Sequence, residues 1–156
     1  MHRLLTEDTP ENRARAFSVY HLVVEGIFAQ TGYFALHTAY SEKHEETPTL
    51  PGLVEGLFRI RGDEGRHVGF GMAKLRELVQ AGGVDPGLLS ETVAELVGLV
   101  QGSLEAGQVD EDELSTSLDL DLAGYAMDKH AERMAQITDA SAEMPDVEGL
   151  TRIEGD

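Results

Sequence analysis

The residues between positions 53 and 78 carry the pattern that most restricts the fold of this chain. Apolar side chains, together with Glu64 and His67, recur there at spacings of three and four residues, which places them on one face of an α-helix. The members of this face are Leu53, Leu57, Ile60, Glu64, His67, Gly71, Leu75 and Leu78. We expect the face to be buried, with Glu64 and His67 in its middle.

Glu64 and His67 are unusual residues for a buried face, because a charge without a partner is very costly to bury. A metal ion is a partner that suits both side chains. Glu-x-x-His on one helix is how bundle proteins offer a carboxylate and an imidazole to one dimetal centre. The spacing also arises by chance, and two arrangements without a metal stay open. Glu64 could pair with Arg61 or Arg66, and His67 could be a core histidine with a hydrogen-bond partner.

The rest of the chain predicts an all-α bundle of four long helices, because no segment alternates apolar and polar residues for long enough to form a sheet. We expect helices from Thr9-Pro10 to about Ser41, from Thr49 or Pro51 to Ala81, from Asp85-Pro86 to about Gly107, and onward from the acidic run 110–113. Residues 1–139 would form one half-length ferritin-like domain, and residues 140–156 an acidic flexible tail.

A second carboxylate lies in an apolar setting on the first helix. Glu25 is flanked by valines and by Gly26-Ile27-Phe28, and His21 precedes it by one turn on the same side. Oxygen and imidazole ligands suit iron or manganese, and the absence of cysteine argues against a structural zinc site. His130 lies among polar neighbours on the fourth helix, so we expect it on a solvated face.

The formal net charge of −17 opposes binding to nucleic acid or to an anionic membrane. Many acidic residues with only three lysines, Lys43, Lys74 and Lys129, favour a halophilic protein, in which dense counterions screen self-repulsion. An ordinary acidic cytosolic protein is the alternative. No segment resembles a signal peptide or a membrane span, so we expect a cytoplasmic location.

Two stretches of the chain together resemble a known family. Tyr20-His21-Leu22-Val23-Val24-Glu25-Gly26, followed by Asp63-Glu64-x-x-His67, is similar to the C-terminal half of the ribonucleotide reductase small-subunit superfamily, and most similar to its ligand-binding oxidase branch. In that superfamily a ferritin-like bundle holds a diiron or manganese–iron centre. The resemblance implies that Glu25, Glu64 and His67 bind the metals and that Asp63 hydrogen-bonds a ligand histidine. It also implies that Tyr20, beside the metals, is an oxidisable side chain.

The function implied by the resemblance is that of a dimetal carboxylate oxidoreductase that activates dioxygen. One alternative is a ribonucleotide reductase small subunit that supplies a radical to a large subunit; another is a non-catalytic helical module. The chain shows one half of the family's metal-binding pattern, and residues 1–19 cannot supply the other half. We therefore expect either a homodimer or a missing N-terminal half as the partner. An apolar wall of Val24, Ile27, Phe28 and Phe34 could also hold a long apolar ligand.

Overall fold

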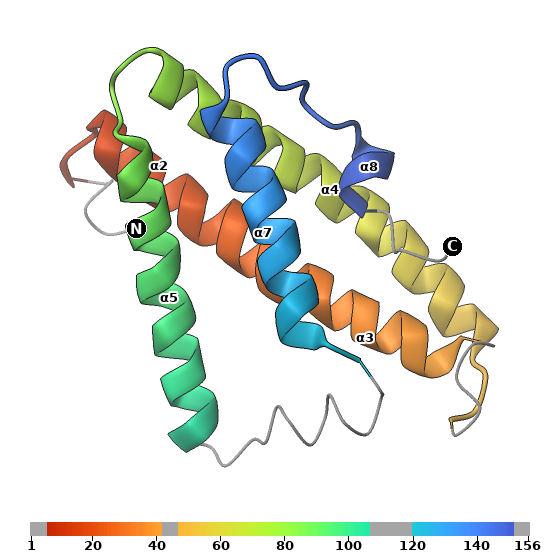
Figure 1. Cartoon of the computed structure of the whole chain (residues 1–156). Coiled ribbons are helices and arrows are strands. Elements are labelled where there is room, and N and C mark those ends of the chain that lie inside the picture. Colours follow the sequence, from red (N-terminus) through yellow and green to blue (C-terminus); the bar gives the residue numbers. More distant parts are fainter. Residues whose placement is uncertain (1–5, 42–46, 107–119, 152–156) are drawn as a thin grey trace.

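The computed structural model describes residues 6–41, 47–106 and 120–151, and within these ranges the chain forms helices and no strand (Figure 1). The helices are α2 (Pro10–Phe17), η1 (Ser18–Ala29), α3 (Gln30–Tyr40), α4 (Pro51–Gln80), α5 (Pro86–Ala106), α7 (Leu122–Thr138) and α8 (Val147–Thr151). The prediction of an all-α packed bundle is confirmed. None of these helices combines the length and the apolar character needed to cross a bilayer.

The first long helix is continuous from α2 through η1 to α3. Thr9 caps its start, where its hydroxyl accepts the backbone N–H of Asn12 at 3.2 Å, and the helix ends at Ser41 in extended backbone. Both ends agree with the sequence prediction. Its middle is a π-helix of 12 residues, in which the N–H of Gln30 donates to the carbonyl of Glu25, five residues earlier. Such wider turns are rare in proteins and are common at functional sites.

The second long helix, α4, ends where the sequence predicts. The backbone of Gly82 has a φ of 69°, a left-handed conformation that glycine adopts without a steric penalty. The N–H groups of Gly82 and Gly83 donate to the carbonyls of Val79 and Leu78, which satisfies the last turn of the helix. The predicted start of the fourth helix, at 110–113, lies outside the described residues. The prediction of one helix running on from there is wrong at 120–121, which are not helical: α7 begins at Leu122, where Asp121 caps it by accepting the backbone N–H of Gly124.

The core lies where η1, α4, α5 and α7 meet. Its fully buried side chains include Leu22, Val68, Met72, Leu75, Leu89 and Ile137. α7 packs against both η1 and α4, and α8 packs against α4. These contacts place the four helices around one hydrophobic core.

The buried face of α4 agrees with the predicted one only in part, at Leu57, Gly71 and Leu75. It contains Leu57, Arg61, Gly65, Val68, Gly71, Met72 and Leu75, whereas Leu53 and Ile60 are 38% and 45% exposed. The reason is the position of α8, which approaches so closely that a Cβ atom on Gly65 would lie 3.1 Å from a Val147 methyl group. The helix therefore turns its Gly65 side inward, and its Ile60 side faces away from the core.

The segment that follows α7 is packed in its described part. Leu150 of α8 is buried, and Met144 packs against the core. These two apolar side chains thus pack on the bundle, and the flexibility of the tail stays a prediction. Residues 152–156 lie outside the described ranges.

Candidate metal centre

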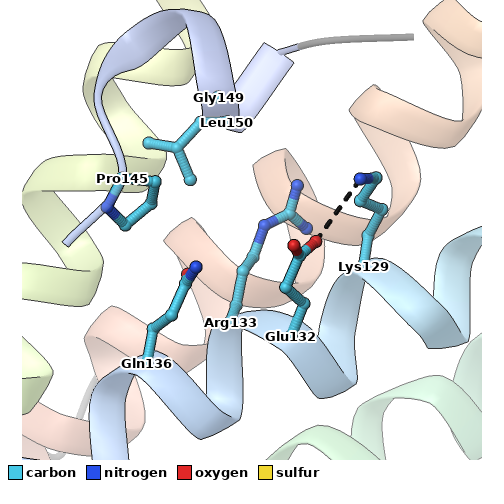
Figure 2. Close-up of a pocket in the computed structure, with 7 residues that line it drawn as sticks. All are labelled: Lys129, Glu132, Arg133, Gln136, Pro145, Gly149 and Leu150. Carbon is cyan, nitrogen blue, oxygen red and sulfur yellow. Dashed lines mark hydrogen bonds and ion pairs between the residues drawn. The ribbon is translucent and has the colours of Figure 1, made fainter. Parts of the chain in front are cut away.

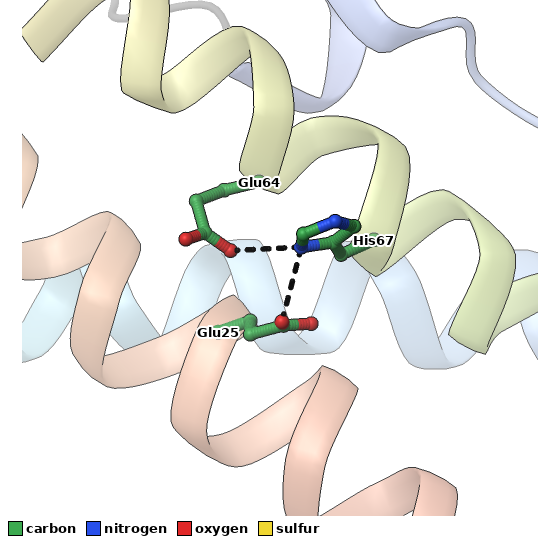
Figure 3. Close-up of side chains that lie close together, drawn as sticks. All are labelled: Glu25, Glu64 and His67. Carbon is green, nitrogen blue, oxygen red and sulfur yellow. Dashed lines mark ion pairs between the residues drawn. The ribbon is translucent and has the colours of Figure 1, made fainter.

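The structure brings Glu25, Glu64 and His67 together (Figure 3). Glu25 comes from η1, and the other two residues come from adjacent turns of α4. The Nδ1 atom of His67 lies 3.3 Å from Oε1 of Glu25 and 3.5 Å from Oε2 of Glu64. One donor atom from each residue lies within 4.8 Å of the other two. We call these three residues the triad.

The triad fits a metal ion by its donor types and by its spacing. Two metal–ligand bonds of about 2.1 Å that meet at a right angle separate their donor atoms by about 3 Å. The distances from Nδ1 of His67 to the oxygens of Glu25 and Glu64 are close to this value. In addition, Oε2 of Glu64 is buried and has no hydrogen-bond partner among the described residues. A buried carboxylate oxygen normally has one, so this atom is available to a cation.

Burial is uneven across the triad. The side chain of Glu25 is 6% exposed, that of Glu64 is 21% exposed and that of His67 is 57% exposed. The expectation that His67 lies in the middle of a buried face is therefore wrong. His67 shares its side of α4 with Ile60, and this side faces away from α7 and α8. The triad is thus anchored in the bundle at Glu25 and open at His67.

His21 is a fourth polar residue of the site, and sequence reasoning did not assign it a role. Its Nδ1 atom lies 2.7 Å from Oε2 of Glu25, and the ring N–H donates to the carboxylate. Both side chains are shielded from solvent, at 13% and 6% exposed. The i, i+4 spacing of His21 and Glu25 was the available signal. Glu25 therefore uses one oxygen for His21 and directs the other toward His67.

The ring of His21 is held by close packing on several sides. Phe17 stacks on it, with ring centroids 5.8 Å apart, and the rings of Tyr20 and Phe70 meet it edge to face at 5.1 and 5.8 Å. Gly71 of α4 leaves room for this ring, because a Cβ atom at that position would clash with the side chain of His21. Tyr20 itself is 46% exposed, and its ring meets that of His21, which bonds to Glu25.

Tyr33 is a second polar residue near the triad outside the predicted ligand set. Burial raises the pKa of its phenol, and the negative charges of Glu64 and Glu25 and a hydrogen bond to Glu64 raise it further. Tyr33 follows Glu25 by eight residues, about two helical turns, so the same side of the helix carries both. The phenol thus remains protonated beside the two carboxylates.

Asp63, the predicted hydrogen-bond partner of a ligand histidine, lies on the surface of α4. Its carboxylate accepts a hydrogen bond from Arg66, and both side chains are about two-thirds exposed (66% and 64%). Arg66 is therefore engaged with Asp63, in place of the pairing with Glu64 that the sequence left open. A role for Asp63 toward the metals stays a prediction.

A buried arginine supports the π-helix next to Glu25. Arg133 of α7 is 3% exposed, and its Nη1 donates to the carbonyl of Gly26 at 2.5 Å. Burial lowers the pKa of this guanidinium. Gly26 permits the approach, because a Cβ atom there would lie 3.2 Å from the same nitrogen.

Arg133 also lines a pocket of about 250 Å³ between α7 and α8 (Figure 2). The other lining residues are Lys129, Glu132, Gln136, Pro145, Gly149 and Leu150. None of them belongs to the triad, so this pocket and the candidate metal centre are separate features.

No protein-family model and no solved structure matches the chain. The class of the protein therefore follows from its own residues. It is a helical bundle in which two helices bring a Glu/Glu/His group together.

Proposed function

We propose that the chain is a metal-dependent oxidoreductase of the dimetal-carboxylate type, with a ferritin-like arrangement of helices, and that it activates dioxygen. The observation that carries this proposal is the convergence of Glu25, Glu64 and His67 from two helices, with a buried oxygen of Glu64 that has no hydrogen bond within the described part of the chain. Two carboxylates and one imidazole suit iron or manganese. When bound, these metals would supply redox chemistry with dioxygen.

The protein's own residues would perform distinct tasks around the metals. Glu25, Glu64 and His67 would bind them, and the residues packed behind Glu25 would fix its orientation. Tyr20 would serve as the oxidisable side chain, since its ring touches His21 and His21 donates to Glu25. Tyr33 is the second oxidisable candidate, because it lies beside Glu64.

A structural ion-pair cluster is the second candidate function, and one observation favours it. His67 lies within 3.5 Å of both carboxylates, so a protonated imidazole could neutralise them without any metal. In that case the chain would be a non-catalytic helical module. The two functions predict different metal contents: the oxidoreductase binds metal at the triad, and the ion-pair cluster does not.

Metal analysis of variants separates the two functions. The wild-type protein and the variants Glu64→Gln, His67→Ala and Glu55→Gln would be reconstituted with Fe(II) and Mn(II), desalted and analysed for bound metal. Glu55 is the matched control, because it is an exposed glutamate of the same helix that pairs with Arg59. We expect wild-type metal content in Glu55→Gln and loss of metal in the other two variants. A wild-type protein that retains no metal would reject the oxidoreductase and favour the ion-pair cluster.

A further inference from the structure

Exposed apolar side chains lie on the two helices that carry the triad. Tyr20, Val24 and Phe28 recur every four residues along η1 and are 46%, 46% and 37% exposed. On α4, Leu53 and Ile60 precede His67 by multiples of seven residues, so they lie on its side of the helix, and they are 38% and 45% exposed. We call these five apolar residues, together with the triad, the open face. An apolar patch of this kind on a protein surface is typical of an interaction site.

The open face lies on the side of η1 and α4 that the other described helices leave uncovered. In Figure 3 the triad faces the viewer, and α7 passes behind the two helices that carry it. A metal ion held by the triad would therefore have protein donors on one side only. Iron and manganese accept more than three ligands, so further donors must come from outside this set.

We infer that a second copy of the chain covers the open face, related to the first by a two-fold axis, so that two triads meet and form one dimetal centre. The inference rests on the proposed metal site and deepens it. A two-fold axis through the open face places the same patch of each chain opposite itself. Apolar residues would then pack against apolar residues, and each triad would lie opposite the other.

The charges of the triad favour a second copy of the chain on the open face when metal is present. Glu25 and Glu64 bring two negative charges per chain, which one divalent ion neutralises. Two metal-loaded open faces can therefore approach each other without net repulsion at the centre, whereas two metal-free faces place four carboxylates together. The assembly should consequently depend on metal.

The charge of the whole chain opposes the same assembly at low salt. Each copy carries a formal net charge of −17, so two copies repel each other. Salt reduces this repulsion, since the Debye length falls from about 10 Å at 0.1 M to about 3 Å at 1 M. The dimer should therefore be favoured in molar salt, and that is the condition for its test.

The test uses two matched substitutions on α4. Ile60→Glu places a charge in the open face, and Phe58→Glu places the same charge on the other side of the helix, where Phe58 is 66% exposed. Val24→Glu repeats the first substitution on η1. Circular dichroism would verify that each variant folds. Light scattering in molar salt would then give the mass with Mn(II) and with a chelator, and elemental analysis would give metal per chain.

We expect metal-loaded wild-type protein and Phe58→Glu to be dimers with two ions, and chelation to return both to monomers. Ile60→Glu and Val24→Glu should remain monomers and lose at least tenfold in Mn(II) affinity. Paramagnetic resonance of the Mn(II)-loaded dimer should show two coupled ions.

The outcomes distinguish this inference from the proposed function. If the wild-type protein binds metal through the triad but remains a monomer, the inference that a second copy covers the open face is wrong, and the proposed metal site still stands. A dimer that Ile60→Glu and Val24→Glu leave unchanged, or one with uncoupled Mn(II) ions, would also overturn it. Wild-type protein without bound metal would reject the metal site and the shared centre together.

Discussion

His21 and Glu25 form a shielded hydrogen bond one helical turn apart, with Nδ1 and Oε2 separated by 2.7 Å. The bond fixes one oxygen of the carboxylate and leaves the other directed toward His67, 3.3 Å away. A ligand that is held in this way before the metal arrives loses little freedom on binding. The geometry of the candidate centre therefore depends on a residue that is not itself a member of the triad.

Replacement of His21 should weaken metal binding without unfolding the protein. His21→Phe keeps a ring between Phe17 and Phe70 but removes the donor to Glu25. We expect a loss of about 10–100-fold in metal affinity, the range seen when a group that orients a ligand is removed. Titration with Mn(II) would measure the loss. His130→Phe, a substitution outside the triad, is the control, and equal affinity in both variants would contradict the role of His21.

Gly71 should be required for the contact between η1 and α4. A Cβ atom there would clash with the Cβ of His21, so Gly71→Ala must push the two helices apart. We expect a decrease of about 1–3 kcal/mol in the free energy of unfolding. Gly62, on the same helix, has open space around it, and Gly62→Ala should instead increase that free energy by about 0.5–1 kcal/mol. Denaturant unfolding of both variants would test the difference in sign.

The two tyrosines near the triad should respond differently to removal of their hydroxyl groups. Tyr20→Phe should leave metal affinity unchanged, because phenylalanine keeps the ring that packs against His21. Tyr33→Phe should lower the affinity, because it removes the polar group of a side chain that lies beside Glu64 and Glu25. If Tyr20 is the oxidisable side chain, any tyrosine radical formed with dioxygen should disappear in Tyr20→Phe. A radical that persists there and vanishes in Tyr33→Phe would reassign this role.

His130 should make the fold sensitive to mild acid. Burial and the positive charge of Arg133 lower its pKa, and its Nδ1 is buried without a hydrogen bond among the described residues. Its polar neighbours in the sequence had instead indicated a solvated face. The unfolded chain takes up a proton more readily than the folded one, so this contribution to stability is complete above the ordinary histidine pKa of about 6.5 and is lost as the pH falls below it.

The measurement for His130 is a difference between two proteins at two pH values. The free energy of unfolding would be compared at about pH 7.5 and about pH 5.5 for wild type and for His130→Gln. The carboxylates titrate in both proteins and cancel in the comparison. We expect the wild type to lose more stability on acidification than the variant, and equal losses would show that His130 is not responsible.

Low salt should lower the melting temperature. Self-repulsion at a net charge of −17 grows as the Debye length increases from about 3 Å at 1 M to about 10 Å at 0.1 M. Thermal unfolding followed by circular dichroism would be measured across this range, with potassium chloride as the salt. A melting temperature that does not change would remove the halophilic interpretation.

The sequence by itself determined the local architecture of this protein. The cap at Thr9 and the three- and four-residue periodicity are properties of neighbouring residues, so they predicted the helices and most of their ends. Spacing along the two helices also singled out Glu25, Glu64 and His67 as candidate ligands, and the structure places them together.

Tertiary packing decided which side of α4 is buried and how the centre is supported. Periodicity places Ile60 and His67 on an apolar face, but it does not say where α7 and α8 will lie, and these helices cover the Gly65 side instead. In the same way, Gly71 accommodates His21, and Arg133 reaches the carbonyl of Gly26 across 107 positions of sequence. Contacts between residues so distant in the chain depend on the docking of whole helices, and local patterns do not encode that docking.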